Sequence, residues 1–183
     1  MARRGTTKFK SNKQEKSVSK ELNGRTVVGS GSRWFADSDV KTDKFLVECK
    51  TTAKNYFSVT TELWEKIERE ATKDHMRIPL MVIDLNNDSV HESERYVVFK
   101  YSTFGRFPCP YAGKLTLEGN KYAPKSHRIT SGYLEILDDA FEDKVYGELF
   151  YIASTRNSSV CPHILFYMRM DDFKEFYEKE LEE

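Results

Sequence analysis

A glutamate and a lysine stand two positions apart in a segment that otherwise has the character of a buried strand. The segment Phe45 to Thr52 reads FLVECKTT and begins with three apolar, β-prone residues. Side chains alternate along a strand, so Glu48 and Lys50 share one face while Cys49 points to the other. A carboxylate and an ammonium group on one rigid strand can hold a cation and orient a water molecule for hydrolysis.

The spacing alone does not define a site, because Glu142-Asp143-Lys144 repeats it in a polar, turn-like stretch. An ordinary surface ion pair, which contributes little to stability, would also account for Glu48 and Lys50. Asp39 distinguishes the first copy, because it ends the preceding predicted strand and hairpin pairing would bring its carboxylate toward Glu48. Two carboxylates repel each other unless a cation lies between them, and oxygen ligands suit Mg²⁺ or Mn²⁺. We therefore expect Mg²⁺ as the cofactor, with Mn²⁺ able to substitute.

The elements that must position these residues form a mixed α/β pattern. The apolar periodicity and the turn residues predict, in chain order, a helix over Gln14 to Leu22, strands over Arg25 to Val28, Trp34 to Val40 and Phe45 to Thr52, a helix over Val59 to Lys73 with Ser58 as its N-cap, and a strand over Pro79 to Leu85. Strands followed by a helix and another apolar strand indicate a mixed sheet with a crossover helix.

The second half of the chain is rich in short aromatic strands. They are predicted over Tyr96 to Tyr101, Lys114 to Leu117, Tyr133 to Leu137 and Tyr146 to Ala153, and are followed by a strand over His163 to Met170 and an acidic helix over Asp171 to Leu181. We expect four segments: a flexible basic arm at 1–13, a core at 14–85, a β-rich insertion or extension at 90–160, and a strand plus helix at 163–183 that could dock on the core.

Composition indicates a folded protein of the cytoplasm. The net charge is zero, but residues 1–20 contain seven Lys or Arg and one acid, whereas 171–183 contain seven acids and two lysines. A basic N-terminal arm suits contact with phosphate groups, although a solvated, frayed terminus would look the same. Three widely spaced cysteines argue against a disulfide framework, and no apolar run is long enough to cross a membrane.

The order of these motifs resembles the PD-(D/E)xK nuclease superfamily, and within it the Holliday-junction resolvases of the archaeal and phage type. The resemblance covers residues 14 to about 85 and rests on Gln14-Glu15-Lys16, Asn23-Gly24-Arg25, Gly29-Ser30-Gly31-Ser32, Ser38-Asp39-Val40, the segment Phe45 to Thr52, and the helix Leu63 to Ala71. It implies a restriction-endonuclease-like mixed central sheet flanked by helices, here with a β-rich second half.

The resemblance also implies roles for individual residues. Metal-dependent phosphodiester cleavage would be carried out by Glu15, Asp39, Glu48 and Lys50, with the metal held by Asp39, Glu48, Glu15 and the backbone carbonyl of Cys49. Many relatives have glycine where this chain has Ser38, and Asp37 offers a competing carboxylate. DNA contacts would come from the Gly-Ser loop and the basic arm, through Ser30, Ser32, Arg33, Arg3, Arg4, Lys8 and Lys10.

The implied function is a structure-selective DNA endonuclease that resolves four-way junctions by symmetric cuts in recombination or repair. Its partners would be branched DNA and a second copy of the chain, with no membrane, and the resemblance favours a phage-encoded protein in the cytoplasm of a bacterial host. Two alternatives remain open: a restriction-like or repair nuclease acting on duplex, flap or single-stranded DNA, and a catalytically silent DNA-binding or assembly protein.

Overall fold

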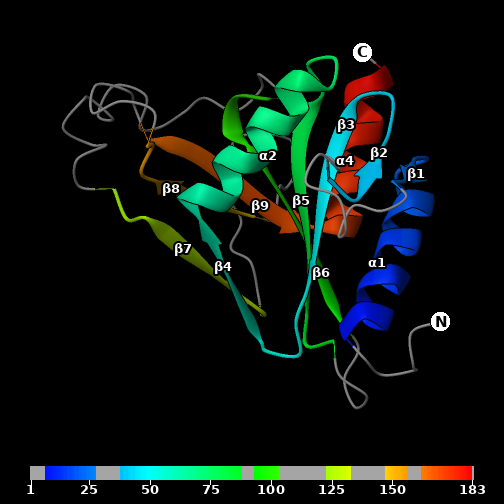
Figure 1. Ribbon diagram of the computed structural model, residues 1–183, viewed down its shortest axis with the longest axis horizontal. Helices are drawn as coiled ribbons and strands as arrows, with labels where there is room; N and C mark the ends of the chain where they lie inside the picture. The colour runs from blue at the N-terminus through cyan, green and yellow to red at the C-terminus, as the bar shows by residue number, and fades with distance from the viewer. Residues whose placement is uncertain are drawn as a thin grey trace.

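A computed structural model describes residues 7–27, 38–87, 93–103, 123–132, 147–155 and 162–182. Its elements are α1 (Thr7–Glu21), β1 (Arg25–Thr26), β2 (Val40–Lys41), β3 (Phe45–Thr51), β4 (Tyr56–Thr60), α2 (Thr61–Lys73), β5 (Ile78–Leu85), β6 (Glu94–Lys100), η1 (Tyr101–Thr103), β7 (Ser126–Thr130), β8 (Glu148–Ile152), β9 (His163–Arg169) and α4 (Met170–Glu182), as Figure 1 shows.

The centre of the fold is a mixed sheet with the strand order β1-β2-β3-β5-β6-β9-β8. β3 and β5 are parallel and are connected through β4 and α2, whereas the other neighbouring strands are antiparallel. Parallel neighbours require a crossover connection, which α2 supplies. The predicted fold class, a mixed α/β sheet flanked by helices, is confirmed.

Helices and a second small sheet cover the two faces of the main sheet (Figure 1). On one face, Val18 of α1 and Phe173 of α4 join an apolar cluster with Val47 and Val82. On the other face, α2 and the two-stranded sheet of β4 and β7 enclose a second apolar cluster around Trp64. In the described ranges, no helix has both the length and the apolar character needed to cross a membrane.

α1 begins at Thr7 instead of Gln14, so the flexible arm expected over residues 1–13 is too long. Residues 7–13 are helical, and Lys10 donates a hydrogen bond to the backbone carbonyl of Asn87, at the end of β5. This stretch has no apolar face to give a helical periodicity, which is why the sequence pattern did not reveal it.

The expected boundary between a core at 14–85 and a β-rich insertion or extension at 90–160 does not divide the main sheet. β6 lies inside the main sheet between β5 and β9, and Val97, Val98 and Phe99 are fully buried. β8 and β9 extend the same sheet, and the Phe45 ring lies 6.0 Å from that of Phe173 and 4.9 Å from that of Tyr177 in α4. Both halves of the chain therefore build one sheet. The strands expected over 114–117 and 133–137 lie outside the described residues.

The N-cap of α2 is Thr60, where Ser58 was expected. The Thr60 hydroxyl oxygen accepts a hydrogen bond from the Leu63 N–H at 3.2 Å, while Ser58 lies within β4 opposite Arg128 of β7. The pairing of β4 with a strand far along the chain keeps residues 56–60 extended and delays the start of the helix.

We expect Thr60→Ala to lower the free energy of unfolding by about 1 kcal/mol, because it removes an N-cap hydrogen bond. Ser58→Ala is the matched control and should leave stability nearly unchanged. Urea unfolding followed by circular dichroism measures both variants. A larger loss for Ser58→Ala than for Thr60→Ala would contradict this assignment of the cap.

Glu65 fixes the side of α2 that faces the second half of the chain. Its buried carboxylate accepts hydrogen bonds from the Thr155 N–H at 2.7 Å and from the Thr155 hydroxyl, and lies 3.2 Å from His163 Nε2. Burial acts to raise the pKa of Glu65, but the hydrogen bonds from Thr155 and the contact with His163 outweigh it and lower the pKa to about 2.

The lowered pKa makes part of the stability pH-dependent. Glu65 should stabilise the fold fully above its ordinary pKa of 4.5, and this contribution should disappear as the pH falls toward 2. We therefore expect Glu65→Gln to cost on the order of 2 kcal/mol at pH 6 and progressively less toward pH 3. Unfolding measured across this range tests the effect, with the exposed Glu62→Gln of the same helix as the control. A pH-independent penalty for Glu65→Gln would be inconsistent with it.

Candidate active site

Glu48 and Lys50 lie in the half of β3 that stands at an edge of the main sheet. β2 pairs with β3 only through Val40 with Val47 and Lys41 with Leu46. From Glu48 onward, the described strands provide a neighbour on the β5 side alone. The two charged side chains therefore lie where a core strand becomes accessible.

The two side chains form a close ion pair that is sheltered on one side. Lys50 Nζ lies 2.6 Å from Glu48 Oε1, and the Glu48 side chain is only 6% exposed, whereas that of Lys50 is 32% exposed. Burial acts to lower the pKa of Lys50, but the charge and hydrogen bond of Glu48, together with the charge of Asp39, raise it above its ordinary value. Lys50 therefore carries a firmly held positive charge at neutral pH.

Asp39 reaches the same part of β3 from the segment just before β2. Its Oδ2 accepts a hydrogen bond from the backbone N–H of Cys49 at 2.8 Å, so its carboxylate lies beside the residue between Glu48 and Lys50. The Cys49 side chain points into the apolar cluster on the opposite side of the strand, as strand alternation predicts. Burial, with the charges of Asp39 and Glu15, raises the pKa of its thiol well above the ordinary value. The competing Asp37 lies outside the described residues.

Ser38 has a backbone conformation that glycine usually occupies. Its φ is 36°, in the left-handed region that glycine adopts most easily. Its N–H and hydroxyl both donate to Glu70 Oε2, at 3.2 and 3.0 Å. Glu70 Oε1 lies 3.6 Å from Lys66 Nζ, which in turn lies 3.7 Å from Glu48. α2 thus contributes to the site through Lys66.

α1 contributes Glu15 from the other side of the sheet edge. The Glu15 carboxylate accepts a hydrogen bond from the Ser11 hydroxyl at 3.0 Å. Burial is the main cause that raises its pKa; the hydrogen bond from Ser11 opposes burial, the charges of Asp39 and Glu48 raise the pKa further, and the charge of Lys50 lowers it. The four residues predicted to carry the chemistry therefore interact electrostatically.

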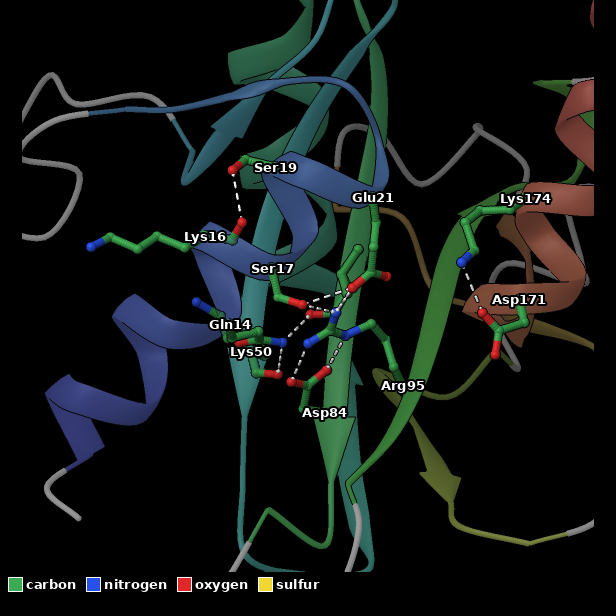
Figure 2. A network of polar contacts seen from close by, with 11 residues as sticks. Gln14, Lys16, Ser17, Ser19, Glu21, Lys50, Asp84, Arg95, Asp171 and Lys174 are labelled. Carbon is green, nitrogen blue, oxygen red and sulfur yellow. Dashed lines mark hydrogen bonds and ion pairs between the residues drawn. The ribbon is translucent and has the colours of Figure 1, made fainter. Parts of the chain in front are cut away.

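Gln14, next to Glu15, ties α1 directly to the strand that carries Lys50. Its side-chain N–H donates to the backbone carbonyl of Lys50 at 2.9 Å and to that of Val82 at 3.3 Å (Figure 2). The residue is almost completely buried, at 2% exposed. The sequence contains one indication that Gln14 is buried: it lies four residues, about one helical turn, before Val18 and so on the same face of the helix.

A buried ionic network fixes the following turns of the same helix (Figure 2). Arg95 of β6 donates to both oxygens of Asp84 at 2.7 and 2.8 Å, to the Ser17 hydroxyl at 3.0 Å, and to Glu21. Buried charges must be paired, so an aspartate at the end of the apolar run of β5 was a signal for a partner such as Arg95. The sequence analysis missed this pair, through which Arg95 links α1 to β5.

The predicted DNA contacts are placed only in part. Lys8 is exposed on α1, whereas Lys10 is half-buried through its contact with Asn87. The remaining candidates lie outside the described residues: Arg3, Arg4, Ser30, Ser32 and Arg33.

The donor atoms at the edge of β3 suit a hard cation. Among the described residues, no three His, Cys, Asp or Glu side chains are arranged as a ready-made metal cage. Mg²⁺ does not require one, because it commonly keeps several waters and uses one or two carboxylates. Asp39, Glu48 and the backbone carbonyl of Cys49 offer oxygen donors of this kind. The residues present therefore fit a divalent ion.

Comparison with known proteins finds similarity to solved structures. No family model and no curated protein matches the sequence. The structure of Hjc, a Holliday junction resolvase from the archaeon Archaeoglobus fulgidus, is 16% identical, covers 49% of this chain and 72% of that chain, and has a TM-score of 0.35. Similarity at this level assigns no activity to this chain. The central mixed sheet flanked by helices is in itself consistent with a restriction-endonuclease-like fold.

Proposed function

We propose that this protein is a metal-dependent endonuclease that cleaves branched DNA, with the four-way junction as its main substrate. The observation that carries the proposal is the convergence of Asp39, Glu48 and Lys50 at the open edge of β3. The order of motifs from Glu15 to Lys50, which resembles that of the junction resolvases of the PD-(D/E)xK superfamily, supports the choice of substrate.

In the proposed mechanism, Asp39, Glu48 and the backbone carbonyl of Cys49 would hold the divalent ion, with Glu15 contributing directly or through water. When bound, Mg²⁺ would stabilise negative charge on the scissile phosphate and lower the pKa of a water molecule. Lys50 keeps its proton at neutral pH, because the charge of Glu48 raises its pKa. Its part is therefore to donate a hydrogen bond to the attacking water or to the phosphate, where it stabilises the charge that develops during hydrolysis.

Branched DNA would be recognised through its shape and its phosphates rather than its base sequence. A resolvase must cut two strands symmetrically, so the proposal includes a homodimer in which each copy supplies one site. The corresponding biological setting is DNA recombination or repair, in the cytoplasm of a bacterial host if a phage encodes the protein.

A substrate panel tests the proposal. Labelled four-way junction, flap, duplex and single strand are incubated with the protein in Mg²⁺ or in EDTA. We expect paired nicks in the junction that require Mg²⁺. Cleavage of plain duplex would instead indicate a restriction-like nuclease, and DNA binding without cleavage in Mg²⁺ or Mn²⁺ would indicate a catalytically silent protein.

A further inference from the structure

The small sheet of β4 and β7 has one face that plays no part in the proposed chemistry. Val59 and Ile129 point inward, into the apolar cluster around Trp64. The opposite side, which we call the β4–β7 outer face, carries three cross-strand pairs: Tyr56 with Thr130, Ser58 with Arg128, and Thr60 with Ser126. This face presents hydroxyl groups and a guanidinium group, and none of its six side chains is a carboxylate.

Two cations lie on one aromatic ring at an end of this face. The Arg128 guanidinium carbon is 4.5 Å from the centre of the Tyr56 ring, and Lys54 Nζ is 5.2 Å from it. Lys54 and Arg128 are both exposed, and within the described parts of the chain neither has a carboxylate at salt-bridge distance. The ring holds the two positive charges through cation–π contacts, so they are available to a negatively charged ligand.

One end of the β4–β7 outer face is joined through a short turn to the end of β3, the strand that carries Glu48 and Lys50. The chain passes from Lys50 at the end of β3 through a short turn to Lys54 and Tyr56 at the start of β4 (Figure 1). The turn is fixed to β5, because the Asn86 N–H donates to the Lys54 carbonyl at 3.0 Å and the Thr52 N–H donates to that of Asp84 at 2.9 Å. The end of the outer face at which Lys54 and Arg128 meet on the Tyr56 ring is therefore held a few residues along the chain from Lys50.

We propose that the β4–β7 outer face binds the sugar–phosphate backbone of nucleic acid that extends from the candidate active site, with Arg128 and Lys54 contacting phosphates. The identity of the ligand rests on the proposed function. The chemistry fits, because guanidinium groups match phosphate geometry, serine and threonine hydroxyls commonly contact phosphates, and aromatic rings flanked by cations accept sugars and bases. In a chain with no net charge, a face free of carboxylates removes the repulsion that the polyanion would otherwise meet.

The salt dependence of binding tests this surface. Fluorescence anisotropy with a labelled four-way junction in EDTA measures affinity, without cleavage, between about 50 and 200 mM salt. The variant carries Lys54→Gln with Arg128→Gln. The matched control carries Arg69→Gln with Lys73→Gln, which removes the same charge from exposed positions of α2. We expect the slope of log K against log salt to become shallower by about 0.9 for each lost phosphate contact in the variant, and to change little in the control.

Equal slopes for the variant, the control and the native chain would overturn the proposal, as would the same change in both double variants or a native chain that binds no DNA. Parallel reactions in Mg²⁺ separate this inference from the proposed function. A native chain that binds through these residues but never cleaves would contradict the endonuclease alone. Retained cleavage with unchanged salt slopes would contradict the binding surface alone.

Discussion

The Lys50→Ala variant should cleave four-way junction DNA about 100- to 1,000-fold more slowly than the native chain, with little loss of affinity. Lys50 holds a positive charge 2.6 Å from Glu48 and beside the Asp39 carboxylate, where it can stabilise charge on the phosphate during the reaction. Single-turnover kinetics in Mg²⁺ with enzyme in excess isolates the cleavage step from binding and product release.

Two further variants frame this result. Lys73→Ala makes the same chemical change at the exposed end of α2 and should cleave at the native rate. Lys50→Arg keeps the charge in a different geometry and should fall between the native chain and Lys50→Ala. Unimpaired cleavage by Lys50→Ala would remove Lys50 from the mechanism.

Arg95→Met should lower the free energy of unfolding by about 3–5 kcal/mol. The substitution leaves the Asp84 carboxylate, which is 2% exposed, with no guanidinium to compensate its charge. It also releases Ser17 and Glu21 of α1, so amide hydrogen exchange in α1 should accelerate more than in α2. Urea unfolding gives the energy, and exchange shows where the structure loosens.

The double variant Asp84→Leu with Arg95→Met provides the control. Replacing both charges by apolar groups removes the uncompensated carboxylate, so the double variant should be more stable than Arg95→Met alone. If the single variant were as stable as the double, the uncompensated Asp84 carboxylate would not be the cause of the lost stability.

The strand at the centre of the site could be predicted because its own pattern specifies it. The segment was expected over Phe45 to Thr52 and is observed over Phe45–Thr51, with Val47 and Cys49 on the apolar side and Glu48 and Lys50 on the other. Its apolar first residues, the alternation of its side chains and the polar residues on one face are all properties of the segment itself, so no distant contact is needed to predict it. The final strand and the acidic helix were likewise visible from their own apolar residues.

Pairings between distant segments could not be predicted in the same way. Residues 56–60 form β4 because residues 126–130 pair with them, and nothing in the sequence of residues 56–60 indicates that partner. The same holds for β6, which was expected in an insertion or extension and lies inside the main sheet between β5 and β9. Strand order depends on contacts between residues far apart in the chain, whereas periodicity reports only which side of an element is buried.

The supporting residues of the site were missed for a related reason. The motif drew attention to Glu15, but its neighbour Gln14 makes the contact with the Lys50 backbone. Lys66 looked like one of several exposed charges on a helix until the fold placed it 3.7 Å from Glu48. Residues such as Gln14 and Lys66 support the site from other elements and do not belong to a motif with a fixed spacing. Their role therefore becomes visible only when α1 and α2 are packed on β3.

The central claim is that Glu48 and its neighbours hold a divalent ion that phosphodiester cleavage requires. The most direct measurement follows single-turnover cleavage of an end-labelled four-way junction by the native chain and by Glu48→Gln, over a titration of Mg²⁺ or Mn²⁺. We predict paired nicks by the native chain that appear with the added ion and vanish in EDTA, and no nicks by Glu48→Gln although it binds the junction. Ion-independent cleavage, equal cleavage by Glu48→Gln, or no cleavage by the native chain in either ion would contradict the claim.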